Sequence, residues 1–102
     1  MASRLILHEE LCKVLGSNRC YFQPPESVKL KYPCIIYASV NTDTIYADDS
    51  TYTANKLYEV TVIDEDPDSE IPDRILHHFR RIRSDRDYSA DNLHHYVFKL
   101  YY

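Results

Sequence analysis

Apolar residues recur at helical spacing in two segments of this chain, and each spacing predicts a helix with one buried face. The first segment runs from residue 3 to residue 15 and carries Leu7, Leu11, Val14 and Leu15, followed by a plausible stop at Gly16. The second segment begins near residue 70 and carries Ile71, Ile75, Leu76, Phe79 and Ile82. On the second helix, Arg81 is expected on the side opposite the apolar stripe.

Four other segments are rich in β-branched and aromatic residues and predict strands. They are residues 32–40, 56–64, 83–89 and 95–102. In residues 56–64, the side chains that alternate to either face are largely apolar on both, which predicts a central strand. Residues 19–31 contain Pro24-Pro25, so we expect an extended connection there without regular pairing.

The predicted order is α-β-β-α-β-β in a single domain spanning residues 1–102. The fold class is therefore α+β, with an antiparallel four-stranded sheet and two helices packed on one face. The polar residues 41–55 separate two strands by more than a tight turn requires. We expect them to form either a long hairpin arm or a mobile loop.

The stretch LYEVTVIDEDPDSEIPDR, residues 57–74, joins a buried strand to an acidic turn and a helix start. Asp66, Pro67, Asp68 and Ser69 favour the turn and offer a helix cap. Pro72 falls in the first helical turn, where the missing N–H costs little. Nothing in this junction is typical of a catalytic site.

The composition excludes some function classes and favours association. One glycine in 102 residues cannot build a glycine-rich phosphate loop, and a net charge of −4 argues against a dedicated nucleic-acid binder. Ten tyrosines against three phenylalanines favour a contact surface. The alternative is that the tyrosines only reflect the general preference of this residue for strands.

Charge is segregated along the chain. Residues 43–73 carry ten acidic residues and one lysine, whereas residues 74–86 carry five arginines and one aspartate. This pattern suits head-to-tail contact between subunits, with two ordinary solvated faces as the alternative.

Candidate reactive groups do not combine into a site. Adjacent histidines, His77-His78 and His94-His95, cannot chelate a metal as pairs, because neighbouring side chains diverge. Cys34 lies within a predicted strand, which predicts a buried and inert thiol. The acidic run from Asp64 lacks the spaced oxygens and glycine of a calcium loop. We expect no enzyme activity, metal or cofactor.

The three cysteines show no Cys-x-x-Cys spacing, and the N-terminus lacks the apolar run of a signal peptide or membrane span. These features predict reduced thiols in a protein made in a cytoplasm, without membrane contact.

Six segments carry a resemblance to a known family. They are YFQPPE (Tyr21–Glu26), YPCI (Tyr32–Ile35), YAD (Tyr46–Asp48), YEVTVIDEDPDSEIPD (Tyr58–Asp73), ADNL (Ala90–Leu93) and VFKLYY (Val97–Tyr102). Through them the chain resembles small tail-completion proteins, the tail terminators at the head–tail junction of long-tailed bacteriophages of Gram-positive hosts. The acidic junction is the most specific of these segments.

The resemblance implies a structural virion protein made in the host cytoplasm. Such proteins form a ring, typically of six subunits, that caps the major tail-tube protein and joins it to a head-closure or connector protein. DNA passes through the lumen without sequence-specific binding. Other readings are another neck component such as a head-closure or adaptor protein, a small enzyme or metal-dependent regulator using the histidines and Cys34, and a host-directed prophage protein.

Three regions are candidate contacts between subunits or with partners, each with plain solvent exposure as the alternative. The first is the polar segment of residues 42–54, the second a set of arginines, and the third the C-terminal strand, which could pair edge to edge across a ring. The residues concerned are Asp48, Asp49 and Tyr52 in the first, Arg80, Arg81 and Arg83 in the second, and Tyr101 and Tyr102 in the third.

Overall fold

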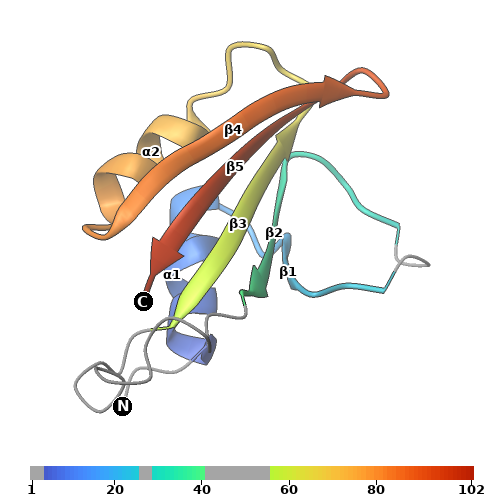
Figure 1. The fold of residues 1–102 in the computed structure, drawn as a ribbon. Helices are drawn as coiled ribbons and strands as arrows, with labels where there is room; N and C mark the ends of the chain where they lie inside the picture. The colour runs from blue at the N-terminus through green and yellow to red at the C-terminus, as the bar shows by residue number, and fades with distance from the viewer. Residues whose placement is uncertain (1–3, 26–28, 41–55) are drawn as a thin grey trace.

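The computed structural model of this chain describes residues 4–25, 29–40 and 56–102. In these ranges the protein is α+β, with two helices on one five-stranded sheet (Figure 1). No helix in these ranges has the length and apolar character needed to cross a membrane. The elements are α1 (Arg4–Leu15), β1 (Cys20–Phe22), β2 (Cys34–Ser39), β3 (Leu57–Asp64), α2 (Ile71–His78), β4 (Ile82–Ala90) and β5 (Leu93–Tyr101).

The sheet has the strand order β1-β2-β3-β5-β4 and is mixed, because β1 runs parallel to β2 while the other pairs are antiparallel. The expected four-stranded antiparallel sheet is therefore wrong in detail. The additional strand, β1, lies within the segment expected to form only an extended connection. It has three residues and is followed by Gln23, with a φ of 45°, and then by Pro24-Pro25, which limit its length without preventing it.

Both helices lie on the same face of the sheet, as expected (Figure 1). One buried cluster contains Leu7 and Leu11 of α1 and Ile75 of α2 together with alternate residues of the strands. On β3 those residues are Tyr58, Val60 and Val62, which confirms the predicted alternation. β3 also has a paired strand on each side, so its predicted central position is confirmed.

The ends of the two helices differ in how well the sequence predicts them. Gly16 adopts a φ of 85° after α1, and its N–H donates to the Cys12 carbonyl at 2.8 Å, as a glycine stop requires. In contrast, α2 ends at His78, and Phe79 is extended with ψ 146°. Arg81 consequently lies in the connection to β4 rather than on the outer face of a longer helix.

β4 and β5 form a hairpin whose loop is Asp91-Asn92, both with positive φ. Positive φ at both central residues is typical of a two-residue hairpin turn, and Asp and Asn tolerate it. β5 is hydrogen-bonded on both sides, to β3 and to β4. β5 therefore has no free edge for the pairing expected across a ring; among the described strands, the edges of the sheet are β4 and β1.

Candidate functional site

Opposite charges lie at opposite ends of the described domain. The strand register places Asp64 beside His94 at one end of β5 and Ile82 beside Leu100 at the other. Six residues of strand separate these positions, about 20 Å at roughly 3.3 Å per residue. The acidic β3–α2 connection follows Asp64, whereas two arginines directly precede Ile82, so the two charged groups are about one sheet length apart.

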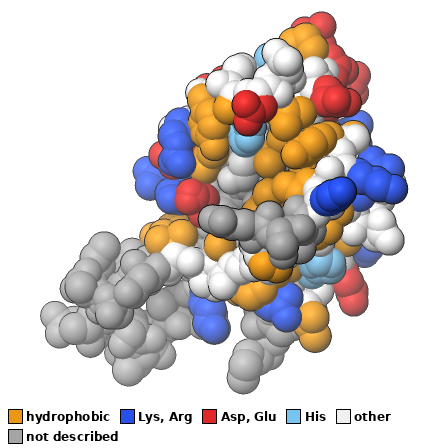
Figure 2. All heavy atoms as spheres, turned by 90° about the vertical axis from the view of Figure 1, so that its right-hand side faces the viewer, with side chains coloured by type: hydrophobic (Ala, Val, Ile, Leu, Met, Phe, Trp, Pro, Cys, Tyr) orange, Lys and Arg blue, Asp and Glu red, His pale blue; other side chains and the backbone are white. Residues whose placement is uncertain are grey.

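The acidic end is an ordered, exposed turn. Asp64 Oδ1 accepts a hydrogen bond from the Asp66 N–H at 3.1 Å, and Asp66 Oδ1 accepts one from the Asp68 N–H at 2.9 Å. Glu65, Asp66, Asp68 and Glu70 are exposed. Figure 2 shows a group of Asp and Glu side chains at the upper end of the molecule, the end at which Figure 1 places this connection.

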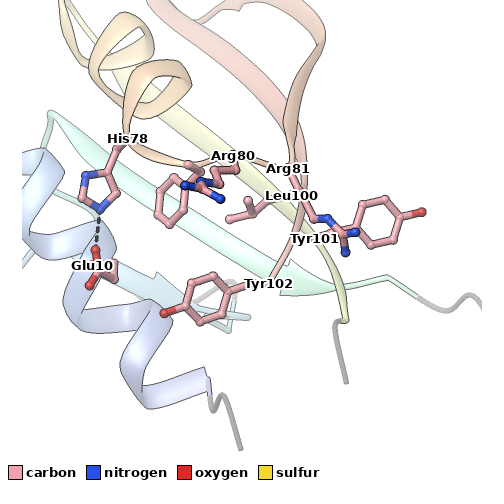
Figure 3. Close-up of a pocket in the computed structure, with 8 residues that line it drawn as sticks. Glu10, His78, Arg80, Arg81, Leu100, Tyr101 and Tyr102 are labelled. Carbon is pink, nitrogen blue, oxygen red and sulfur yellow. Dashed lines mark hydrogen bonds and ion pairs between the residues drawn. The ribbon is translucent and has the colours of Figure 1, made fainter. Parts of the chain in front are cut away.

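The basic end borders a groove with a volume of about 430 Å³ (Figure 3). This volume is within the range of about 300–1,000 Å³ that is usual for ligand pockets. The groove lies where the end of α2, the α2–β4 connection, α1 and the end of β5 meet. Its lining residues are Glu10, His78, Phe79, Arg80, Arg81, Leu100, Tyr101 and Tyr102.

Four of the eight predicted contact residues thus meet in one place, namely Arg80, Arg81, Tyr101 and Tyr102. In Figure 3, Arg80 projects near the middle of the groove, and Arg81 lies with Tyr101 on the side away from Glu10. The Tyr101 N–H donates to the Arg81 carbonyl at 2.9 Å, which fixes the arginine backbone against the end of β5. In the described ranges, no carboxylate forms an ion pair with Arg80 or Arg81.

One wall of the groove joins the two helices. His78 Nε2 and Glu10 Oε1 form a hydrogen-bonded ion pair between α2 and α1. The hydrogen bond from His78 lowers the pKa of Glu10 below its ordinary value, and the charge of His78 lowers it further. Desolvation of the carboxyl group acts in the opposite direction but is the weaker effect. Oε1 of Glu10 is therefore engaged by His78, and Glu10 forms no ion pair with Arg80 or Arg81.

The other wall is aromatic. The Phe79 and Tyr102 rings meet edge to face with centroids 6.2 Å apart. Burial raises the pKa of the Tyr102 phenol, and the nearby charges of Glu10 and Glu9 raise it further. Tyr102 is thus a neutral hydrogen-bond donor at pH 7. Its backbone N–H and carbonyl pair with Lys56, at 2.9 Å and 3.0 Å, so the end of the chain is held in the sheet.

The remaining predicted contact residues are elsewhere or are not described. Arg83 lies on β4 directly opposite Lys99, on the sheet face away from the helices, and does not line the groove. Asp48, Asp49 and Tyr52 are outside the described residues.

Four residues that line the groove were not predicted as contact residues from the sequence. Glu10 and His78 are 68 positions apart, and no local pattern indicates that they pair. Phe79 and Leu100 have the spacing of core residues, and both are buried in the core cluster. Only the three-dimensional meeting of α1, α2 and β5 brings these four together.

The candidate reactive groups remain apart in the described part of the chain. No group of three or more histidine, cysteine, aspartate or glutamate side chains there could hold a metal ion. Cys34 is fully buried, as predicted, and burial raises the pKa of its thiol to about 11. A thiol with such a pKa is largely protonated, and so unreactive, at neutral pH.

Comparisons with known proteins identify no relative. No family model, curated protein or solved structure matches this chain.

Proposed function

We propose that this protein is a structural subunit of a bacteriophage virion that assembles into a ring, caps the tail tube and joins it to the head connector. This proposal extends the resemblance of the sequence to tail terminators. One observation of the structure carries it: the described residues include a basic end and an acidic end that form no ion pairs with other described residues.

The two ends favour association of a particular symmetry. Arg80 and Arg81 have no ion pair with a described carboxylate, and Glu65, Asp66 and Asp68 have none with a described basic residue. Different surfaces that attract each other give heterologous, head-to-tail contacts. Such contacts close into a ring when the rotation between successive subunits divides a full turn. A two-fold dimer satisfies the same charges only when its two copies lie antiparallel, whereas a ring uses one basic and one acidic end at each contact.

The proposed ring encloses a passage for DNA. A net charge of −4 supports a lumen that repels the phosphate backbone, so that DNA passes without sequence-specific binding. Its two rims contact the tail-tube protein on one side and a head-closure protein on the other. A head-closure or adaptor protein of the same neck is the second candidate, since head-to-tail charge pairing suits any ring in that assembly.

Polymerisation of a tail-tube protein separates these candidates. Purified tube protein from a phage that encodes this chain is allowed to polymerise with and without the chain, and the products are resolved by gel filtration. A terminator comigrates with tube ends and arrests elongation at substoichiometric amounts. If tubes elongate equally in its presence and it elutes alone, tube capping is refuted.

A variant without the two histidine pairs separates assembly from chemistry. Simultaneous replacement of His77, His78, His94 and His95 by Ala removes the paired histidines on which the enzymatic or metal-dependent reading relies, and Cys34, its other residue, is fully buried. We expect this variant to arrest tube growth as the wild type does. Loss of the contact between His78 and Glu10 should reduce its stability only slightly. Loss of tube arrest in a variant that remains folded would favour chemistry over assembly.

A further inference from the structure

We propose that the groove beside Tyr102 binds the acidic β3–α2 connection of the next copy of this chain. The inference rests on the proposed function and names the surfaces that meet. The arginines bind the carboxylates of residues 65–70 of the neighbour, and the aromatic wall packs against its Pro67.

The groove has the chemistry of a receptor for an acidic segment. Arg80 and Arg81 supply two guanidinium groups, which bind carboxylates in a bidentate geometry. Among the described lining residues Glu10 is the one carboxylate, and its Oε1 is already engaged by His78. Phe79, Tyr101 and Tyr102 add apolar ring surface next to these charges. Arginine and tyrosine are the residue types most often found at the energetic centre of protein interfaces.

The acidic turn has the complementary chemistry. Its exposed carboxylates flank Pro67, which is itself exposed and carries a rigid apolar ring. The two hydrogen bonds from Asp64 and Asp66 to following backbone N–H groups order the turn before it binds. A preordered segment loses less conformational entropy on binding than a flexible one.

The occupant must come from another molecule. The acidic turn and the groove lie at opposite ends of β5, about 20 Å apart by strand register at roughly 3.3 Å per residue. Because both are fixed to the same sheet, the turn cannot fold back into its own groove. Each copy therefore offers one groove and one turn, the arrangement needed for a head-to-tail chain of subunits.

A synthetic peptide tests this contact even if the protein stays monomeric before assembly. The capped peptide DEDPDSEI, residues 64–71, is titrated into the isotope-labelled full chain and followed by NMR. We expect saturable shifts of the His78, Arg80 and Tyr102 signals with a Kd of about 1 mM or tighter. Arg80→Glu should weaken binding at least about tenfold, because it converts attraction into repulsion.

Matched controls make the result specific. Lys31→Glu reverses an exposed charge outside the groove and should leave the affinity unchanged. A peptide with Lys at the positions of Asp66 and Asp68 should bind the Arg80→Glu chain more tightly than it binds the wild type. Replacement of Pro67 by Ala in the peptide should weaken binding a few-fold. Melting curves establish that each protein variant is folded.

The outcomes distinguish this inference from the proposed function. If the peptide causes no NMR shifts of groove residues, or if wild type and Arg80→Glu bind it equally, the acidic turn does not bind in the groove. Tube arrest by the same preparation would then leave the capping proposal standing. Conversely, peptide binding without tube arrest would support head-to-tail contact and refute the capping role.

Discussion

β3 and β4 flank β5 on opposite sides and pair antiparallel with it over almost its whole length, yet their surroundings differ. In β3, Tyr58, Val60, Val62, Ile63 and Asp64 are buried. In β4, every residue from Arg83 to Ala90 is exposed. Among the described strands β3 is paired on both sides and β4 on one side only, and the two strands also differ in side-chain burial. β3 contributes buried side chains to the core, whereas the side chains of β4 from Arg83 on, and the two arginines before β4, are exposed to solvent.

The sharpest test places the same charge in each strand. Val60→Asp puts a carboxylate into a fully buried position, and the penalty of several kcal/mol is comparable to the whole stability of a small domain. We expect no cooperative unfolding transition for this variant. Ser84→Asp in exposed β4 should stay within about 0.5 kcal/mol of the wild type. Chemical denaturation measures both, and comparable losses would contradict the contrast between the strands.

A second test makes the same comparison within α2. Ile75 is fully buried and Leu76 is 37% exposed, although the two are adjacent. Ile75→Ala should reduce the free energy of unfolding by about 2–5 kcal/mol, since it removes a buried side chain and leaves a cavity. Leu76→Ala should cost well under half as much. Urea titrations of the two variants check the difference, and a reversed order would mean that the helix packs with another face.

Salt separates contact from folding. Between about 0.1 M and about 1 M salt the Debye length falls from about 10 Å to about 3 Å. The affinity of the chain for the acidic peptide of residues 64–71 should fall at least about tenfold over this range, because exposed charges carry the attraction. The melting temperature should change little, since the core is apolar. A salt-independent affinity would indicate that the aromatic wall, and not the arginines, binds the turn.

The smallest expected effect concerns the wall of the groove. Since the pKa of Glu10 is lowered in the folded protein, its stabilising contribution is present above the ordinary carboxyl pKa of about 4.3. That contribution is lost as the pH falls through the lowered folded-state value. His78→Ala should return the pKa of Glu10 to the ordinary range, as measured by NMR titration of its carboxyl carbon. An unchanged Glu10 pKa would show that the two helices are not paired there.

Local signals predicted much of the fold. Alternation identified β3 as central, and Gly16 marked the end of α1. β1 was missed because three residues before two prolines carry too little periodicity to be recognised. The end of α2 was missed because Phe79 has the spacing of a helical core residue, but packs against Tyr102 from an extended backbone.

The groove could be predicted only in part. Charge segregation and the tyrosine-rich C-terminus led to the prediction of Arg80, Arg81, Tyr101 and Tyr102 as candidate contact residues, without indicating that they lie together. Their meeting depends on β5 lying inside the sheet, between β3 and β4, and sequence periodicity does not determine strand order. The ion pair between Glu10 and His78 depends in turn on how the two helices pack.

Tail length in phage particles is the most direct test of the central claim that this protein ends tube growth by assembling at the tube end. The gene is removed from a phage that encodes it, and the particles are imaged by electron microscopy. The account predicts tails of abnormal and variable length that do not join heads, with normal length restored by wild-type protein but not by the Arg80→Glu variant. Normal tails on complete, infectious particles would contradict it.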